Sequence, residues 1–361
     1  MTGENPPTGA KRPVAPGGDL YGTHRSVDPR LGLPQAAWRL DADFSRLFEG
    51  EALIQVETLN IDAASFAQME EAGRHEGDVE GQLARSVVRT VAERGKQHNP
   101  VTGSGGMLLG RVLQVAPGRF DDLEIGQRVA TLVSLTLTPL RIDRVRGVRR
   151  GVAQIDIDGE AVVFASGQCA TLPGDLPERL ALAVLDVAGA APQVARLVRR
   201  GQVVVILGAG GKSGVLCVAE ARRCGGPTAC IVGVESSERA AAELQALGLC
   251  DFVLPIDARS PLSVRRAVLE ATGGREADTT FSCVSVPDVE MSAILSTRDR
   301  GVVYFFAMST SFTQAALGAE GAGKDVDLFI GNGFAQGHAA HTLAMLREMP
   351  AVRALLERRL I

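Results

Sequence analysis

The sequence predicts an α/β protein of two domains, the first rich in β-strands and the second a doubly wound parallel sheet. Its 361 residues suit two domains, because a single hydrophobic core stops growing near ~250–300 residues. From residue 203 onward, short β-branched segments alternate with amphipathic helical ones, as in parallel strands joined by helices. The predicted strands of this half are 203–207, 229–234, 252–255, 279–282, 302–306 and 326–330. The predicted helices are 215–222, 239–247, 262–272, 289–296 and 338–348.

The first half alternates apolar and polar residues over short segments, a pattern typical of half-buried strands. Strands are expected at 51–60, 107–115 and 128–137. Two shorter ones are expected within 156–164, around a turn at Asp158–Gly159. Two helices interrupt the strands, one over 62–68 with Asp62 as its N-cap and one over 78–94.

These patterns divide the chain into four segments. Residues 1–19, rich in Pro, Gly and Thr, are expected to be a disordered lead-in. Residues 20–170 form the β-rich domain and residues 171–335 the parallel-sheet domain. Residues 336–361 are expected to form a C-terminal helix that returns towards the first domain.

Composition and charge exclude several classes of function. The net charge is −4, so the chain lacks the basic surface that nucleic acids require. No apolar run is long enough to cross a bilayer, and the first eighteen residues lack the apolar core of a secretory signal. The six cysteines are scattered without paired spacing, which favours free thiols in a reducing cytoplasm. We therefore expect a cytoplasmic protein that binds neither nucleic acid nor membrane.

The stretch that organises the second half is QVVVILGAGGKSG, residues 202–214. A buried strand, a glycine-dense turn and a helix start follow one another, which is what a pyrophosphate needs in order to bind. Glycines let the backbone approach the phosphates, and the free amides of the helix start bind the anion. An ordinary strand-to-helix turn remains the alternative, because the spacing is not the strict G-x-G-x-x-G. The candidate cofactor-binding residues here are Gly208, Gly210, Gly211, Lys212, Ser213 and Gly214.

A second feature supports a dinucleotide site of Rossmann type. The next predicted strand ends in Glu235, about twenty residues beyond Gly214, where an acidic residue binds the ribose hydroxyls of an adenosine. Its charge disfavours a 2′-phosphate, so NAD is the expected cofactor. Use of NADP as well is left open, because Ser236 and Arg239 follow directly and can accept that phosphate.

A β-rich domain followed by a dinucleotide domain resembles the medium-chain dehydrogenase/reductase superfamily. The resemblance rests on GMLLGRVLQVAPG, LEIGQRVA, the glycine turn and the closing DLFIGNGFAQGHAAHTLAML. It implies a GroES-like first domain, a homodimer, and contact of Cys283, Val284, Ala307 and Met308 with the nicotinamide. The zinc ligands of that superfamily are missing, since Asp62, residues 103–105 and residues 184–186 fall in their places. We expect no metal, because tetrahedral zinc disfavours an all-oxygen site.

Several blocks resemble one family more closely, the L-erythro-3,5-diaminohexanoate dehydrogenases of lysine fermentation. They are YGTHR, LNIDAASF, HNPVTGSGGMLLG, GAGGKSG, TRDRG and AALGAEGAGKDVDLFIGNG. The resemblance implies NAD(P)-dependent oxidative deamination of a small dicationic amino acid at C3, which yields 5-amino-3-oxohexanoate, ammonium and the reduced cofactor.

That reaction needs a base for the substrate ammonium, donors for its carboxylate, and acidic partners for its two cations. Asp62 is the first candidate for base or ammonium anchor, and a helix N-cap carboxylate is the alternative. Asp186 lies in an apolar segment, where a carboxylate is either a base or a hydrogen-bonded structural group.

Four further residues complete the candidate set. Glu320 and Lys324 belong to a glycine-rich loop, where Lys324 would bind the carboxylate or take the ammonium proton. A solvated surface pair is the alternative for these two. His98 would relay protons or cap a turn, and Ser104 would donate a hydrogen bond in place of a metal ligand.

Two other functions compete with this one. A zinc-independent quinone or enoyl reductase shares the fold and the glycine turn, but its neutral substrates need few acids. A non-catalytic cofactor-binding protein is the second competitor, and polar loops around the site argue against it. Function resides in the site and not in the fold, so the residues of the site must decide between these three functions.

Overall fold

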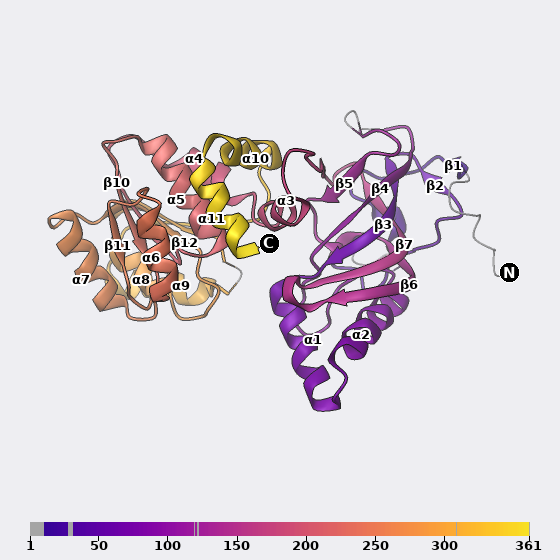
Figure 1. Cartoon of the computed structure of the whole chain (residues 1–361), viewed down its shortest axis with the longest axis horizontal. Helices are drawn as coiled ribbons and strands as arrows, with labels where there is room; N and C mark the ends of the chain where they lie inside the picture. The colour runs from indigo at the N-terminus through magenta and orange to yellow at the C-terminus, as the bar shows by residue number, and fades with distance from the viewer. Residues whose placement is uncertain (1–10, 28–31, 119, 121–122, 308, 361) are drawn as a thin grey trace. The chain divides into compact units, whose positions relative to one another are not determined.

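The computed structural model describes residues 11–27, 32–118, 120, 123–307 and 309–360. The chain divides into two compact units, the first ending at Asp175 and the second beginning at Leu176. Each unit has its own sheet and core, and each is described by itself below (Figure 1).

Within the described ranges, the first unit is built on a six-stranded antiparallel sheet in the order β6-β7-β3-β4-β5-β8. Its strands are β3 (Glu51–Asn60), β4 (Met107–Val115), β5 (Arg128–Thr131), β6 (Leu140–Arg149), β7 (Gln154–Phe164) and β8 (Cys169–Thr171). A short parallel pair, β1 (Val14–Ala15) and β2 (Leu47–Phe48), lies apart from this sheet. Single 3₁₀ turns occupy Thr23–Arg25, Leu135–Leu137 and Arg150–Val152.

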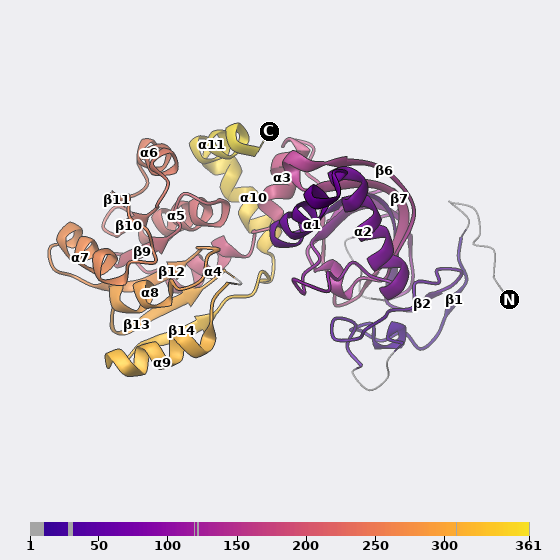
Figure 2. The same ribbon diagram turned by 90° about the horizontal axis from the view of Figure 1, so that it is seen from below.

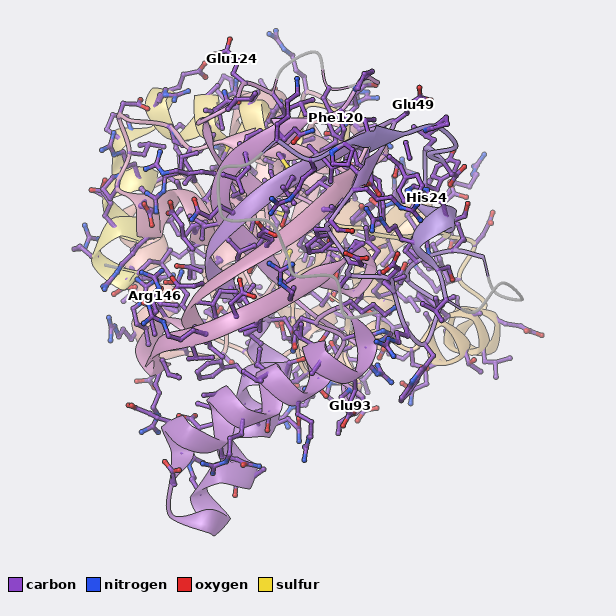
Figure 3. The ribbon with its side chains drawn as sticks, turned by 90° about the vertical axis from the view of Figure 1, so that its right-hand side faces the viewer. His24, Glu49, Glu93, Phe120, Glu124 and Arg146 are labelled. Carbon is purple, nitrogen blue, oxygen red and sulfur yellow. The ribbon has the colours of Figure 1, made fainter. Side chains whose placement is uncertain are left out.

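Two helices cover this sheet, α1 (Ala63–Glu76) and α2 (Val79–Arg94). The predicted apolar face of α2 is confirmed, since Leu83, Val87 and Val91 are buried against β3 and its neighbours. In Figure 3 the helices run beneath the strands, with Glu93 on α2 and Arg146 on β6. The helix over 62–68 was expected to be short, whereas α1 continues to Glu76 before Gly77 ends it with a left-handed backbone.

The predicted hairpin at Asp158–Gly159 is wrong, because β7 runs unbroken through both residues. The pairing of β7 with β3 shifts register between Val56 and Thr58, so an irregularity in the ladder takes the place of a turn. Gly159 is needed there for a different reason, since a Cβ would lie 2.3 Å from the carbonyl oxygen of Arg141. The predicted strand 128–137 is also shorter, and a 3₁₀ turn follows it.

Residues 11–19, expected to be disordered, are held against the first sheet. Arg12 is buried, and its Nη2 donates to Glu160 Oε1 at 2.9 Å. Its backbone exchanges two hydrogen bonds with the amide of Gln114, at 2.7 and 2.9 Å. A buried ion pair therefore fixes a segment whose composition alone predicts disorder. Residues 1–10 lie outside the described residues.

The second unit has a parallel sheet in the order β11-β10-β9-β12-β13-β14, which is the Rossmann order 3-2-1-4-5-6. The predicted α/β fold of this half is confirmed. Its strands are β9 (Val203–Leu207), β10 (Cys230–Val234), β11 (Phe252–Leu254), β12 (Ala277–Ser282), β13 (Thr297–Phe305) and β14 (Asp327–Ile330).

Helices cover both faces of this sheet. One face packs on α4 (Ala190–Leu197), α5 (Lys212–Gly225) and α6 (Glu238–Ala246). The other packs on α7 (Pro261–Thr272), α8 (Glu290–Ser296) and α9 (Phe312–Ala322). Figure 2 shows α5 and α6 on one side of the strands and α9 on the other. Helix α3 (Glu178–Leu185) precedes α4, and among the described residues no single helix is long and apolar enough to cross a membrane, although α3 and α4 pass that test as a bent pair.

The chain ends in two helices instead of one, α10 (His338–Glu348) and α11 (Pro350–Leu360). Both pack within the second unit, α10 on α3 and α4 and α11 on α3 and α5. Leu346, Val352 and Leu356 are buried there. The single expected helix over 336–361 is therefore two helices, and their apolar faces are used within their own unit.

Candidate functional site

The glycine turn joins β9 to α5 in the second unit, as predicted. Gly208 has φ +70°, which favours glycine, and Gly211 is the N-cap of α5 without any side-chain hydrogen bond to the helix. A Cβ on Gly214 would lie 2.1 Å from the carbonyl oxygen of Gly208. The first amides of α5 therefore have no side-chain cap, which suits an anion.

Gly210 is constrained by Glu235, the residue that follows β10. Glu235 Oε2 accepts from the Gly210 N–H at 3.0 Å, and its Oε1 accepts from the Ser237 N–H at 2.9 Å. A Cβ on Gly210 would meet the same carboxylate at 2.8 Å, whereas one on Gly211 would be 3.4 Å from its nearest neighbour. A side chain would therefore be crowded at Gly210, whereas Gly211 has room for one.

A cavity of about 300 Å³ opens at the carboxyl ends of β9, β10 and β12. Six of the thirteen predicted cofactor-binding residues line it, namely Gly208, Gly211, Glu235, Ser236, Cys283 and Val284. Ala307 is half-buried and lies two residues beyond the end of β13. Met308 lies outside the described residues. Open amides, a glycine cradle and an acidic strand end fit a dinucleotide.

Two residues assigned to different roles bind each other instead. Lys212 Nζ donates to Asp186 Oδ2 at 2.9 Å, and both side chains are partly exposed. Asp186 is the C-cap of α3 and is exposed, so its expected burial is wrong, whereas its role as a base stays a prediction. Ser213 is half-buried in the first turn of α5. Arg239 is largely exposed and pairs with Glu243 at 3.2 Å.

The glycine turn has one contact that sequence reasoning missed. Arg359 of α11 donates through Nη1 to the carbonyl oxygen of Gly210 and through Nε to Glu243 Oε2 at 2.6 Å. The side chain is mostly buried. The end of α11 therefore stabilises the turn through hydrogen bonds. No local sequence pattern predicts such a contact.

Lys324 and Glu320 do not join the cofactor cavity. Lys324 Nζ donates to Glu276 Oε2 at 2.9 Å, just before β12 begins, and so at the amino ends of the strands. The cavity lies at their carboxyl ends. Glu320 is exposed in the last turn of α9, where a loop was expected. The prediction of catalytic roles for these two residues is therefore corrected to a structural ion pair and an exposed helix residue.

The candidate chemistry of the first unit begins where β3 ends and α1 starts. Asp62 is the N-cap of α1, and its Oδ1 accepts from the Ser65 N–H at 2.8 Å. Its Oδ2 is buried and has no hydrogen-bond partner in the described part of the chain. The two interpretations of Asp62 are thus compatible, because one oxygen caps the helix and the other is left for a ligand.

Three hydroxyl groups meet beside this carboxylate. Ser65 Oγ lies 2.5 Å from Thr102 Oγ1 and 2.9 Å from Ser104 Oγ, and the last two are 2.9 Å apart. Asn99 orders the loop, since its Oδ1 accepts from the N–H groups of Val101 and Thr102. Ser104 was predicted from the sequence, but Ser65 and Thr102 were missed. We call these three side chains the hydroxyl ring.

The segment that leads into this loop is polar and buried. Lys96 is fully buried and donates to the carbonyl oxygens of Pro34 and Gln35, at 2.6 and 3.0 Å. Burial, together with the charge of Arg94, lowers the pKa of Lys96 to about 8. Burial, followed by the charges of Lys96 and Arg94, also lowers the pKa of His98. His98 Nδ1 is buried without a partner in the described residues.

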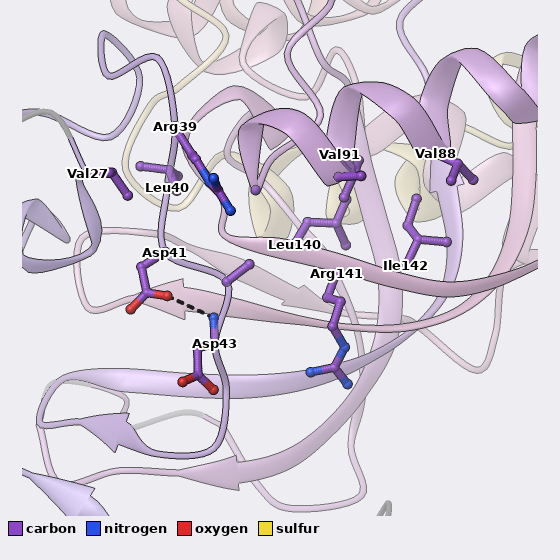
Figure 4. A pocket seen from close by; sticks show the side chains of 13 residues that line it. Val27, Arg39, Leu40, Asp41, Asp43, Val88, Val91, Leu140, Arg141 and Ile142 are labelled. Carbon is purple, nitrogen blue, oxygen red and sulfur yellow. Dashed lines mark hydrogen bonds between the residues drawn. The ribbon is translucent and has the colours of Figure 1, made fainter. Parts of the chain in front are cut away.

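A larger cavity of the first unit, about 580 Å³, is separate from this site (Figure 4). Arg39, Asp41, Asp43 and Arg141 surround an apolar floor that includes Leu140. Leu140 begins β6, whereas Arg149 at its far end pairs through Gln154 with Asn60, next to Asp62. The cavity and the carboxylate of Asp62 are therefore at opposite ends of β6.

Among the described residues, no group of three or more His, Cys, Asp or Glu could hold a metal ion. The thiols of Cys217 and Cys283 also lack the character of metal ligands. Cys217 and Cys283 are buried with their sulfur atoms 3.6 Å apart. Their hydrogen bond, with burial next, raises the pKa of Cys217. A raised pKa disfavours the thiolate form that binds metals.

Solved structures of oxidoreductases share the fold of this chain. A mycobacterial protein solved with NADPH matches with a TM-score of 0.52 and 18% identity, over 86% of this chain and 88% of that one. The enoyl reductase CurK matches with a TM-score of 0.51 and 14% identity, over 86% of this chain and 79% of that one. At these identities the likeness is one of fold alone.

Sequence relatives narrow the class to one family. The L-erythro-3,5-diaminohexanoate dehydrogenase of Acetoanaerobium sticklandii is 47% identical over 344 residues, which cover 94% of this chain and 98% of that one. The enzyme of the same name from Fusobacterium nucleatum is 48% identical over 340 residues, 94% of this chain and 97% of that one. A family model described as the N-terminal domain of this dehydrogenase matches residues 24–173. The chain belongs to the L-erythro-3,5-diaminohexanoate dehydrogenase family, and the resemblance noted in the sequence is confirmed.

Proposed function

We propose that this chain catalyses the oxidative deamination of L-erythro-3,5-diaminohexanoate at C3. The products would be 5-amino-3-oxohexanoate, ammonium and a reduced nicotinamide cofactor. The observation that carries the proposal is the identity of 47% with a relative of that name, extended over 94% of this chain. An alignment of this extent spans both the Asp62 region and the glycine turn.

The chemistry of Asp62 supports the reaction. Before hydride can leave C3, the ammonium on that carbon must lose a proton so that its lone pair can assist. The free Oδ2 of Asp62 is a buried acceptor suited to take this proton. The bound cofactor supplies the acceptor for the hydride. Water then adds to the resulting C=N group, and ammonium leaves as the ketone forms.

The cofactor is a nicotinamide dinucleotide, and we propose that NAD is preferred over NADP. Glu235 presents its carboxylate at the end of β10, on the wall of the dinucleotide cavity. Each of its oxygens accepts one backbone N–H and keeps a lone pair for a ribose hydroxyl. Its negative charge would repel a 2′-phosphate, and the nearby Arg239 is already paired with Glu243.

The reductase alternative has less support. The enoyl reductase and the quinone oxidoreductases among the structural matches share only 14–17% identity with this chain, which is a likeness of fold. A neutral conjugated substrate would also leave the buried Asp62 Oδ2 unpaired, and this costs free energy.

The test is to mix the purified protein with L-erythro-3,5-diaminohexanoate and NAD, then NADP, and follow absorbance at the reduced-nicotinamide band. Ammonium release is assayed in the same samples. We expect reduction matched by an equal amount of ammonium, faster with NAD. Reduction without ammonium, or tight cofactor binding with no turnover of this substrate, would overturn the proposal. Turnover of a quinone or an enoyl thioester with NADPH would then favour the reductase.

A further inference from the structure

The hydroxyl ring has a fixed balance of hydrogen-bond donors and acceptors. Each hydroxyl carries one hydrogen and two acceptor positions. Three contacts of 2.5, 2.9 and 2.9 Å close the ring, so each of Ser65, Thr102 and Ser104 donates once and accepts once. This count holds for either direction around the ring. No hydroxyl hydrogen is left over, and the ring presents only acceptors to a ligand.

After the ring has formed, each of the three oxygens keeps one acceptor position, and one of these is used within the protein. Thr102 Oγ1 accepts from the Ser104 N–H at 3.4 Å, a long bond. Ser65 Oγ and Ser104 Oγ keep a position each. Ser65 is fully buried, whereas Thr102 and Ser104 are partly exposed, so the ring has one covered side and one open side. A group that binds there must donate, and an anion such as a carboxylate would find no donor among these hydroxyls.

Ser65 links the ring to Asp62. Its N–H donates to Asp62 Oδ1 at 2.8 Å while its hydroxyl belongs to the ring. Two acceptor groups, the free Asp62 Oδ2 and the ring, therefore lie within one helical turn of each other. The proposed substrate carries ammonium groups on C3 and C5, with one carbon between them. Its two nitrogens are a similarly short distance apart.

The two acceptors differ in what they do with a proton. A carboxylate can take one from an ammonium group, whereas a hydroxyl oxygen accepts a hydrogen bond without becoming protonated near pH 7. The ammonium to be oxidised must lose a proton, and the other must stay charged and held. Resting on the proposed function, we propose that the hydroxyl ring binds the C5 ammonium and thereby selects a diamino acid, while Asp62 receives the C3 ammonium. Ser104 Oγ, on the open side, is then the acceptor for this ammonium, and Thr102 is a positioning residue whose hydroxyl keeps the ring closed and its hydrogens turned away from the ligand.

The experiment compares three ligands on wild-type protein and on Thr102→Val, which replaces the hydroxyl by a methyl group of similar size. The ligands are L-erythro-3,5-diaminohexanoate, 3-aminohexanoate, which lacks the C5 amine, and 5-aminohexanoate, which lacks the reacting amine and is used as an inhibitor. In the variant we expect KM for the diamino substrate to rise about 10- to 100-fold, the range of a hydrogen bond to a charged group. The Ki of 5-aminohexanoate should rise equally. Rates with 3-aminohexanoate should stay within about twofold, because removing one hydroxyl leaves its C3 ammonium site intact.

Two further variants keep the result interpretable. Thr102→Ser retains the hydroxyl and should restore the wild-type KM. Thr171→Val removes a hydroxyl on β8 that accepts from Gln127 and should change nothing. If Thr102→Val weakens both substrates equally, or if 5-aminohexanoate inhibits it as well as it inhibits wild type, the ring does not bind the C5 ammonium. Absence of diaminohexanoate turnover in the wild type would instead reject the proposed function itself.

Discussion

Each unit has a helix of 14 residues that begins at a candidate functional site, α1 in the first unit and α5 in the second. The two helix starts suit ligands of opposite charge. Helix α5 begins at Gly211, which offers its amides no side chain. Helix α1 begins at Asp62, whose carboxylate occupies one amide and adds an acceptor. The first arrangement suits an anion and the second a cation. One residue at the N-cap decides which ligand a helix start can bind.

The largest expected effect comes from Asp62→Asn. Asparagine caps a helix as well as aspartate does, so unfolding free energy should change by less than about 0.5 kcal/mol. The base is lost, and kcat should fall about 10²- to 10⁴-fold. Initial rates and a urea titration measure the two quantities. Asp78 caps α2 in the same way, through Gly81 at 3.0 Å, so Asp78→Asn is the matched control and should retain full activity. Equal losses in both variants would refute a role for Asp62 in proton transfer.

Gly214→Ala tests the anion side of the comparison. The added Cβ would meet the Gly208 carbonyl oxygen at 2.1 Å, so the turn must move. NADH affinity, measured by its fluorescence on titration, should fall about 100-fold through lost hydrogen bonds to the charged phosphates. Gly321→Ala in α9 has open space and should bind NADH normally. Wild-type affinity in Gly214→Ala would show that the turn does not bind the cofactor.

Glu235→Gln should alter the choice of cofactor. It removes the charge that faces the 2′ position but keeps an acceptor for one backbone N–H. The ratio of kcat/KM for NAD to that for NADP should fall about tenfold, as expected for one partly screened charge. Glu238→Gln, in the exposed first turn of α6, is the control. An unchanged ratio would mean that another group discriminates the two cofactors.

The smallest effect concerns Lys96, which anchors the segment before the hydroxyl ring. Burial lowers its pKa from the ordinary value of 10.5 to about 8. Between these two values the unfolded chain binds the extra proton, so the stability contributed by this group rises with pH over that interval. Lys96→Met should lose this rise. The difference in unfolding free energy between wild type and variant should move by roughly 1 kcal/mol in favour of wild type across it, after allowance for solvent screening.

Thermal or urea unfolding of both proteins at about pH 7.5, 8.5, 9.5 and 10.5 checks the Lys96 prediction. Lys11→Met, at an exposed position, provides the reference for loss of a lysine charge. A constant difference across this range would show that Lys96 keeps an ordinary affinity for its proton in the folded state.

Local signals made the second unit predictable. The β-branched run of β9 was predicted with its observed bounds. The alternation of strands and helices along the chain predicted a parallel sheet, as observed. The glycine-rich stretch of α9 was misjudged as a loop. Its glycine at 318 allows close packing instead, since a Cβ there would lie 2.4 Å from Met291 Sδ on α8. A contact between helices overrode a local preference.

The sequence predicted those functional residues that can be identified from their own segment of the chain. Asp62 was identified as both N-cap and functional candidate, and Ser104 as a polar group in the place of a metal ligand. Thr102 and Ser65 were missed because their contact joins residues 37 apart, and neither hydroxyl is unusual in its own segment. Lys324 was misplaced because its partner Glu276 is 48 residues away in the sequence, directly before the central strand β12.

The contact between Arg359 and the Gly210 carbonyl has a consequence for synthesis of the chain. The two residues are 149 positions apart. At about 5–20 residues per second, the ribosome adds Arg359 roughly 7–30 s after Gly210. During that interval the glycine turn of a nascent chain lacks the hydrogen bond that Arg359 donates to it.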